Sequence, residues 1–358
     1  MLRYLEIKKQ LMDMVSTMEP GQRLPDRPSL CRMLDTTRTT VDKAIKELVE
    51  QDILSSRKGS GTYVVGALDG AVEDAVNWCV IIPDITESIY SSLVNGIESV
   101  AQAHNANVIL CNSGNDSGRQ EKNIRRLLVS GVAGFIIVPV IANDPVENYQ
   151  LYSSLIRSDV PFIFCNRSVD GVSAPVVTSN DFYGGYIATK HLISKGYRNI
   201  AFLARQKYRT SMDRCQGYLG ALLECGLDID RRLIVIPERS GQEIDCRAEF
   251  ISLLEEKAGQ VDAVFCFNDD IAVKAMEAVK HAGLKVSDQV GVIGYDDTEI
   301  CNSQHPRLSS VLYKSEQIGE KAAELLYELC SGKPKSSRFE YYLFQPEIAE
   351  RESCRGPR

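Results

Sequence analysis

Hydroxyl and basic side chains gather at the start of a short amphipathic segment near the N-terminus. The run Thr37-Arg38-Thr39-Thr40 precedes apolar residues at helical spacing, and Lys43 follows within one turn. Threonine hydroxyls and backbone N–H groups bind phosphate oxygens, and arginine binds either a phosphate or the edge of a guanine. These residue types at the exposed start of a helix predict a surface that contacts DNA.

A second set of polar side chains follows short apolar runs farther along the chain. Asn166 and Arg167 come directly after one run, Asn268 after another, and Asp296 after a third. Open α/β sheets bind ligands outside the carboxyl ends of their strands. Carboxylates and amides accept hydrogen bonds from hydroxyls, and arginine donates them in a fixed fork, so this set suits a polyol. The aromatic residues that could cover the apolar face of a sugar ring are Tyr90, Phe182 and Tyr183.

Each of these polar residues also has a purely structural interpretation. Asp296 and Asp297 could cap a following helix, because acidic residues are favoured at helix N-termini. Asn268 could hold a turn, and Arg214 could be a surface residue of its helix. The residue pattern alone leaves both interpretations open.

The sequence offers little support for catalysis or for a metal site. The four histidines lie in helical patterns or, in one case, directly before a proline. A Gly-x-Ser-x-Gly elbow, a phosphate-binding glycine-rich loop and a His-Glu-x-x-His motif are all missing from the sequence. The 11 cysteines include no Cys-x-x-Cys pair, which favours reduced core thiols over a disulfide framework or a zinc site. We therefore expect no enzyme activity, no cofactor and no metal.

Three helical patterns and a hairpin must position the N-terminal basic surface. Residues 1–18 carry apolar residues at roughly helical spacing, and residues 35–38 form a polar connection between two later helices. The apolar faces of those two helices are Leu30, Met33 and Leu34, then Val41, Ala44, Ile45, Leu48 and Val49. Two strand-like pieces then flank a basic tip that contains Lys58 and Gly61, which indicates a wing. This order is typical of a helix-turn-helix that places its recognition helix in the major groove.

From residue 78 onward, short buried-strand runs alternate with amphipathic helical patterns, which is typical of parallel α/β sheets. The predicted strands are residues 78–83, 107–111, 134–139, 161–165, 175–178, 199–204, 233–237, 263–267 and 290–294, with a strand-like tail at 339–344. Predicted helices include residues 90–104, 119–130, 183–195, 211–225, 241–257, 271–282 and 315–330. So many strands predict two doubly wound lobes with a cleft between them rather than one sheet.

The N-terminal region resembles the winged-helix head of the GntR family. The matching segments are Pro20-Gly21, Leu24-Pro25, Arg38-Thr39-Thr40-Val41, Lys43-Ala44 and Gly59-Ser60-Gly61-Thr62-Tyr63-Val64. Two positions depart from the family pattern. Asp26-Arg27-Pro28 stands where the family has Ser-Glu-Arg, so that Arg27 would take the place of the first DNA-contacting arginine. Asp42 replaces a basic residue and would either repel phosphate or accept a hydrogen bond from a cytosine amine.

Residues 78–354 resemble the LacI/GalR effector-binding domain, which is itself similar to periplasmic sugar-binding proteins. The resemblance is carried by Ile82-Pro83-Asp84-Ile85-Thr86, Ala188-Thr189-Lys190-His191-Leu192-Ile193, Arg214-Cys215-Gln216-Gly217-Tyr218, Phe267-Asn268-Asp269, Val292-Ile293-Gly294-Tyr295-Asp296-Asp297 and the ending from Pro346 to Ser353. A GntR-type head on a LacI-type body is the layout of the arabinose-repressor type of regulator. The resemblance implies that the ligand contacts are Asn166, Arg214, Asn268 and Asp296, with Tyr90, Phe182 and Arg167 as further contacts.

Length and charge agree with two domains of different function. The chain has 358 residues and a net charge of −7. Residues 1–66 carry 11 Lys and Arg against 9 Asp and Glu, whereas the remainder carries 30 against 39. A mildly basic head on an acidic body fits a protein that touches DNA with its head alone. We expect a head at residues 1–66, a linker at 67–77, and an effector-binding and dimerisation domain at 78–358.

These features predict a cytoplasmic, ligand-responsive transcription regulator, with a repressor favoured over an activator. The head would read operator DNA as a homodimer, with base and phosphate contacts from Arg27, Thr37, Arg38, Thr39, Thr40, Lys43, Lys58 and Gly61. A small-molecule effector, for which the cleft favours a sugar, would close the lobes. The first 18 residues are amphipathic and charged rather than a signal peptide, and no apolar run reaches membrane-spanning length. The alternatives are a sugar-binding transport or chemoreceptor component and, third, an α/β enzyme.

Overall fold

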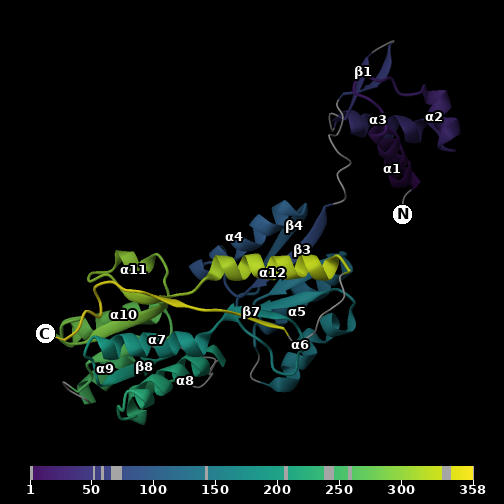
Figure 1. Cartoon of the computed structure of the whole chain (residues 1–358). Coiled ribbons are helices and arrows are strands. Elements are labelled where there is room, and N and C mark those ends of the chain that lie inside the picture. The colour runs from purple at the N-terminus through teal and green to yellow at the C-terminus, as the bar shows by residue number, and fades with distance from the viewer. Residues whose placement is uncertain are drawn as a thin grey trace. The chain divides into compact units, whose positions relative to one another are not determined.

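The chain forms two compact units, Met1–Ala75 and Val76–Arg358, in the computed structural model (Figure 1). The structure describes residues 3–50, 53–57, 60–65, 75–141, 144–204, 209–237, 246–256, 260–332 and 340–357. Within these residues, no helix combines the length and apolarity needed to cross a membrane.

The N-terminal unit is a three-helix bundle with a two-stranded hairpin. Its elements are α1 (Arg3–Ser16), α2 (Arg27–Met33), α3 (Arg38–Glu50), β1 (Leu54–Arg57) and β2 (Gly61–Val64). The core is made by fully buried side chains from all three helices, among them Leu11, Leu30, Val41 and Leu48. The strands of the hairpin are antiparallel, and Arg23 pairs with Tyr63 through a further bridge. The predicted helix, turn, helix and wing are therefore confirmed.

Local sequence explains where the second helix begins. Asp26 caps α2 by accepting a hydrogen bond from the Ser29 backbone N–H at 2.9 Å. Pro28 occupies the first turn, where a missing backbone N–H costs nothing. The departure from the family pattern at residues 26–28 thus still provides a helix start.

The larger unit contains two doubly wound lobes, as the alternating pattern predicts. The first lobe consists of β3 (Val76–Ile82), α4 (Ser88–Ala103), β4 (Ala106–Asn112), α5 (Ser117–Val129), β5 (Gly134–Ile137), α6 (Pro145–Arg157), β6 (Phe162–Cys165), β7 (Val176–Ser179), α12 (Ser315–Cys330) and β13 (Tyr341–Phe344). The second consists of α7 (Asp181–Ser194), β8 (Ile200–Leu203), α8 (Arg209–Glu224), the 3-10 turn η1 (Arg231–Leu233), β9 (Ile234–Val235), α9 (Cys246–Glu256), β10 (Ala263–Cys266), α10 (Asp269–His281), β11 (Gly291–Asp296), α11 (Ile300–Ser303), β12 (Ser309–Leu312) and β14 (Glu347–Ala349).

Both sheets are parallel except for one edge strand. The strand orders are β13-β7-β6-β5-β3-β4 and β14-β12-β11-β10-β8-β9, and β14 runs antiparallel to β12. Alternate residues of β3 show how the sheets are covered. Trp78 and Val80 belong to the core that includes residues of α4 and α12, while Cys79 and Ile81 belong to the core that includes residues of α5 and α6.

The chain crosses between the lobes three times in its described part. The crossings lie between β7 and α7, between β12 and α12, and between β13 and β14. Because the carboxyl ends of the central strands of both lobes lie near these crossings, the loops that follow those strands meet in the cleft. This arrangement positions the candidate ligand site.

Some predicted boundaries differ from the structure. Val76 and Asn77, which the sequence places in the linker, are the first residues of β3. Val76 is 43% exposed, and the continuous run of buried residues that marks the strand begins only at Trp78. Residues 66–74 lie outside the described residues. Helix α6 and three short elements, α11, β12 and β14, are not among the predicted elements, and η1 replaces the start of the strand expected at 233–237.

Candidate functional sites

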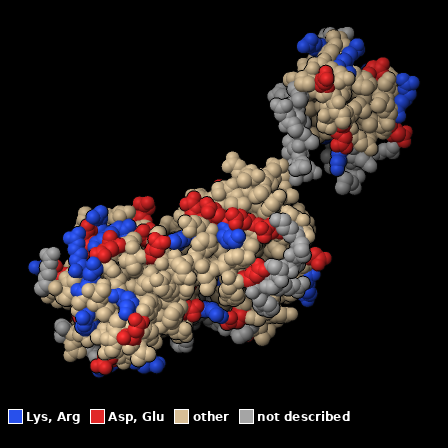
Figure 2. Space-filling model, in the orientation of Figure 1, with Lys and Arg blue, Asp and Glu red and all other residues tan. Residues whose placement is uncertain are grey.

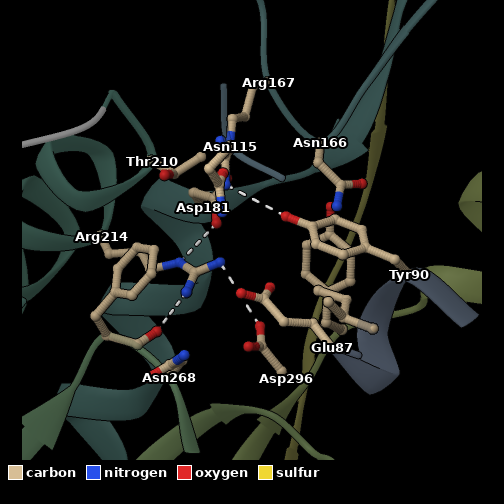
Figure 3. A pocket seen from close by; sticks show the side chains of 13 residues that line it. Glu87, Tyr90, Asn115, Asn166, Arg167, Asp181, Thr210, Arg214, Asn268 and Asp296 are labelled. Carbon is tan, nitrogen blue, oxygen red and sulfur yellow. Dashed lines mark hydrogen bonds and ion pairs between the residues drawn. The ribbon is translucent and has the colours of Figure 1, made fainter. Parts of the chain in front are cut away.

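A cavity of about 190 Å³ lies between the two lobes (Figure 3). Both lobes contribute to its lining, which consists of Glu87, Ile89, Tyr90, Asn115, Asn166, Arg167, Asp181, Thr210, Arg214, Phe267, Asn268, Asp296 and Tyr313. Most of these residues follow a strand or begin a helix, as expected for the ligand crevice of an α/β sheet.

Arg214, from α8, is the central side chain of this cavity. Its Nε donates to Asp181 Oδ1 at 2.7 Å, its Nη2 lies 3.9 Å from Asp296 Oδ1, and its Nη1 donates to the Phe267 carbonyl. The guanidinium also lies over the Tyr295 ring, 3.4 Å from its centroid. Figure 3 shows the guanidinium between the two carboxyl groups. These contacts hold a buried cation in a fixed orientation toward the cavity.

Burial controls the protonation of this cluster. It raises the pKa of the Asp181 carboxyl, against the opposing effect of Arg214. It also raises the pKa of Asp296 well above its usual range, again opposed by Arg214. Burial lowers the pKa of Arg214, but Asp181, Tyr295 and Asp296 together outweigh this effect and leave that pKa above its ordinary value. The arginine is therefore the fixed charge of the site.

Asn166 and Asp296 hold unusual backbone conformations at the edge of the cavity. Asn166 has φ of 63° and Asp296 has φ of 103°, and each residue lies at the carboxyl end of a strand, one in each lobe. Residues with positive φ cluster at functional sites, where the surrounding structure maintains the strain. Asn166 is 8% exposed, and its Oδ1 has no hydrogen-bond partner among the described residues. A buried amide oxygen of this kind requires a partner, which a ligand can supply.

Arg167 and Tyr90 form the wall contributed by the first lobe. Arg167 Nη2 donates to the Tyr90 hydroxyl at 3.3 Å, and Nη1 donates to the Pro139 carbonyl at 3.5 Å. Asn268, on the opposite lobe, caps α10 by accepting from the Ile271 N–H at 3.1 Å. Because the side-chain oxygen of Asn268 already accepts this hydrogen bond, its amide N–H groups can donate hydrogen bonds to a ligand.

The structure brings six of the seven predicted ligand residues together around this cavity. Phe182 is the exception: it lines a neighbouring cavity, and its ring extends toward Gly220 of α8. The reason is that residue 182 is the second residue of α7, so its side chain points to a different side of that helix from Asp181. The polar and aromatic lining residues that the sequence did not indicate are Glu87, Asn115, Asp181, Thr210, Phe267 and Tyr313.

The lining carries both acidic and basic groups and is rich in hydrogen-bonding groups. Glu87, Asp181 and Asp296 contribute carboxyl groups, and Arg167 and Arg214 contribute guanidinium groups. Asp181 and Arg214 already form an ion pair with each other. Such a site favours an uncharged ligand with several hydroxyls over a phosphorylated one. Among the described residues, no group of three His, Cys, Asp or Glu is placed to hold a metal ion.

The candidate nucleic-acid interface is the exposed start of α3. Arg38, Thr39 and Lys43 are exposed there, and the Arg38 side chain is 77% accessible. Thr37 precedes the helix, and its hydroxyl lies 2.9 Å from that of Thr40. Figure 2 shows, by contrast, a row of acidic side chains along α12, where Glu316, Glu320, Glu324 and Glu328 recur every four residues. That face of the larger unit is unsuited to phosphate.

Arg27 and Asp42, the two departures from the family pattern, contact each other. Arg27 Nε donates to Asp42 Oδ1 at 2.8 Å, and its Nη1 donates to the Thr62 hydroxyl at 3.1 Å. Arg38 lies one helical turn from Asp42, with 3.7 Å between Nε and Oδ2. Two arginines therefore neutralise Asp42, and Arg27 connects α2 to both α3 and the wing.

The wing contains two of the predicted DNA contacts, Lys58 and Gly61. Lys58 lies outside the described residues. Gly61 has φ of +129°, and a Cβ there would come within 2.6 Å of Arg23 Nε. Only glycine fits this conformation without strain, and the group that approaches it closely is an arginine side chain.

Replacing Asp42 with asparagine is expected to tighten binding to random-sequence duplex DNA. Without the carboxylate, Arg27 and Arg38 become available to phosphates, which should steepen the dependence of log K on log salt by about one for each arginine that gains a phosphate. Fluorescence anisotropy across a KCl series measures this slope. Glu50→Gln is the control, because Glu50 is also on α3 and pairs with Lys46 at its far end. Equal gains from both variants would show a bulk charge effect and contradict the local explanation.

Comparison with known proteins gives two family matches. Residues 75–346 match the family of periplasmic binding proteins and the sugar-binding domain of the LacI family. Residues 3–64 match the gntR family of bacterial regulatory proteins.

Individual relatives cover most of the chain. The arabinose metabolism transcriptional repressor of Geobacillus stearothermophilus is 24% identical and covers 99% of this chain and 98% of its own. The transcriptional repressor PurR of Vibrio campbellii is 29% identical, with 90% of each chain covered. A LacI family regulator from Enterococcus faecium, solved with bound ribose, is 26% identical with a TM-score of 0.64, covering 79% of this chain and 99% of its own.

Proposed function

Because the chain belongs to the family of periplasmic binding proteins and LacI-type sugar-binding domains and carries a gntR-type head, we propose that it is a cytoplasmic, sugar-responsive transcriptional repressor. One observation carries the proposal: the same chain contains a winged helix-turn-helix and, in its larger unit, a polar cavity between two lobes. A DNA-binding unit and a ligand cavity on one chain are what a ligand-controlled regulator needs.

A sugar is the effector class that the cavity favours. Asp181, Asp296 and Asn166 offer acceptors, Arg167 and Arg214 offer donors, and the rings of Tyr90, Phe267 and Tyr313 offer apolar faces. The ribose complex of the Enterococcus faecium regulator and the arabinose repressor of Geobacillus stearothermophilus support this class. The PurR relative makes a purine the alternative that an experiment must exclude.

The effector would act by selecting one arrangement of the lobes. Arg167 and Tyr90 belong to one lobe and Arg214 and Asn268 to the other, so a ligand that contacts all four binds a closed cleft better than an open one. A ligand shifts such an equilibrium only by its difference in affinity for the two states. In a homodimer, closure would alter the placement of two heads on a pseudo-palindromic operator.

A thermal-shift screen of the full chain tests the effector class. The probes are monosaccharides, sugar phosphates, short oligosaccharides and free purines. A ligand that binds only the folded protein raises the melting temperature by mass action. A shift with neutral sugars supports the proposal, whereas a shift confined to purines or sugar phosphates would replace the sugar assignment.

Replacing Arg38 with alanine tests the DNA interface. Loss of an arginine contact to a guanine or phosphate is expected to weaken operator binding by about 1–3 kcal/mol, while the thermal shift with the effector stays the same. Gel-shift titration with an operator selected from genomic fragments measures this. Arg125→Ala is the matched control, because Arg125 is also exposed and paired with an acid one turn away. Unchanged operator affinity for Arg38→Ala would remove α3 as the recognition helix.

A further inference from the structure

A second cavity of about 270 Å³ adjoins the central one. The two cavities share Asn166, Arg167, Asp181 and Thr210 in their linings. The second space therefore lies no farther than these shared side chains from a ligand seated in the central cavity. Neither the pattern of polar residues nor the proposed function accounts for the second space.

The walls of the second cavity include large apolar side chains exposed to solvent. Phe182 is 48% exposed, Tyr341 is 53% exposed and Leu343 is 50% exposed. Tyr341 and Leu343 share one face of the edge strand β13, while Tyr342 and Phe344, on its other face, pack against the core. Exposed rings gathered around a cavity are typical of a ligand site rather than of an ordinary surface.

Polar groups complete this second cavity. Arg209, Thr210 and Asp213 from the first turns of α8 lie along it, and Arg209 Nε is 3.8 Å from Asp213 Oδ2. The charges of the arginine and the acid offset each other. Apolar rings beside hydroxyls and paired charges suit an uncharged sugar ring, which has apolar faces and polar edges.

We propose that the effector is a glycoside of at least two sugar units. One ring occupies the central cavity, and the second ring lies in the adjoining cavity against Tyr341 and Phe182. This inference rests on the proposed function, because it extends the same sugar site.

On the side of Asp296, the cleft offers no comparable exposed aromatic wall. A cavity of about 340 Å³ there shares Ile89, Asp296 and Tyr313 with the central one, but Tyr313 is only 5% exposed and the rest of the lining is mostly polar or charged. Another cavity of about 260 Å³ there shares Glu87, Asn268 and Asp296 with the central one. Its lining adds Asp270 and Glu299 and includes no aromatic side chain, lysine or arginine among the described residues. A second sugar ring would find carboxylates there, with Ile89 and Ile300 as the apolar side chains and no aromatic ring for its face. Because the exposed rings of Phe182 and Tyr341 line the cavity beside β13, we place the second sugar unit there.

Titration calorimetry of the full chain with matched sugars tests the inference. The pairs are glucose with cellobiose, xylose with xylobiose, and arabinose with arabinobiose. We expect one disaccharide to bind at least about tenfold more tightly than its own single unit. Tyr341→Ala should lower the affinity for that disaccharide by about three- to tenfold, because a stacked ring contributes on that scale. The affinity for the single unit should stay the same.

Two further variants separate binding from folding. Tyr341→Phe keeps the ring and should keep the disaccharide affinity. Tyr149→Ala removes another exposed tyrosine, 56% accessible on α6 of the same lobe, and should change neither affinity. Equal affinity for single and double units, or a Tyr341→Ala variant that binds the disaccharide normally, overturns this inference and leaves the sugar-effector proposal standing. Failure of every sugar to bind overturns both.

Discussion

Replacing Arg214 with methionine is expected to lower the free energy of unfolding by about 3–5 kcal/mol. The side chains of Arg214 and Asp181 are only 5% and 6% exposed, so removing the arginine leaves a buried carboxyl group without its cation. Urea denaturation followed by Trp78 fluorescence measures the loss. Trp78 is the only tryptophan of the chain and is fully buried in β3, so its signal reports the larger unit and not the head.

A double variant distinguishes the lost ion pair from lost packing. In Arg214→Met with Asp181→Asn, no carboxylate is left at residue 181, and part of the stability should return because breaking a buried pair costs more than replacing it. Asp296 can accept a proton, since burial already raises its pKa. Arg209→Met is the control on the same helix; its pairs with Asp170 and Asp213 are exposed and contribute about 0–1 kcal/mol. Strictly additive losses in the double variant would contradict an ion-pair origin.

The alternation of apolar runs and amphipathic segments is sufficient to predict two doubly wound lobes. Strand β12 escapes that pattern for a physical reason. Its buried positions include Ser309 and Ser310. The Ser309 hydroxyl accepts a hydrogen bond from the Arg351 backbone N–H at 2.8 Å, and the Ser310 hydroxyl donates one to Asp269 Oδ1 at 2.6 Å. Hydrophobic periodicity cannot reveal a strand in which two of the three buried residues are serines, each with a partner some forty positions away in the chain. The partners become visible only once the lobes are assembled.

The candidate ligand site shows a similar limit. Asn166, Asn268 and Asp296 follow recognisable strands, so their position at the cleft can be predicted. Asp181 cannot be found in this way, because an acid at the start of a helix stabilises any helix. Its partner Arg214 is 33 residues away and packs against it only through the contact between α7 and α8. Residues that complete a site by long-range pairing carry no local signal.

The DNA-binding unit shows that two departures from a family pattern can be one feature. In the sequence, Arg27 and Asp42 are 15 positions apart and suggest separate changes in DNA contact. In the structure, they form one ion pair between the start of α2 and the exposed side of α3. Asp42 therefore has a partner within the protein, and Arg27, which the sequence predicts to contact DNA, is partly engaged by Asp42 and Thr62. Their role at the operator remains a prediction.

Replacing Asp296 with asparagine is expected to weaken effector binding by about 1.5–3 kcal/mol, or roughly ten- to 150-fold. The carboxyl group faces the central cavity at the end of β11, where it can accept hydrogen bonds from ligand hydroxyls. Asparagine keeps its size but offers only one acceptor oxygen. Titration calorimetry with the sugar identified by the screen measures the change, and operator affinity without effector should stay at the level of the unchanged protein.

Asp270→Asn provides the control for this variant. Asp270 lies in the first turn of α10, is exposed, and does not line the central cavity, so its loss should leave effector binding unchanged. If Asp296→Asn binds effector normally and yet fails to respond at the operator, the residue transmits closure rather than contacting the ligand. Affinity coupling between two sites is reciprocal, so operator DNA would then also lose its effect on effector affinity. Normal binding together with a normal response would place the ligand elsewhere in the cleft.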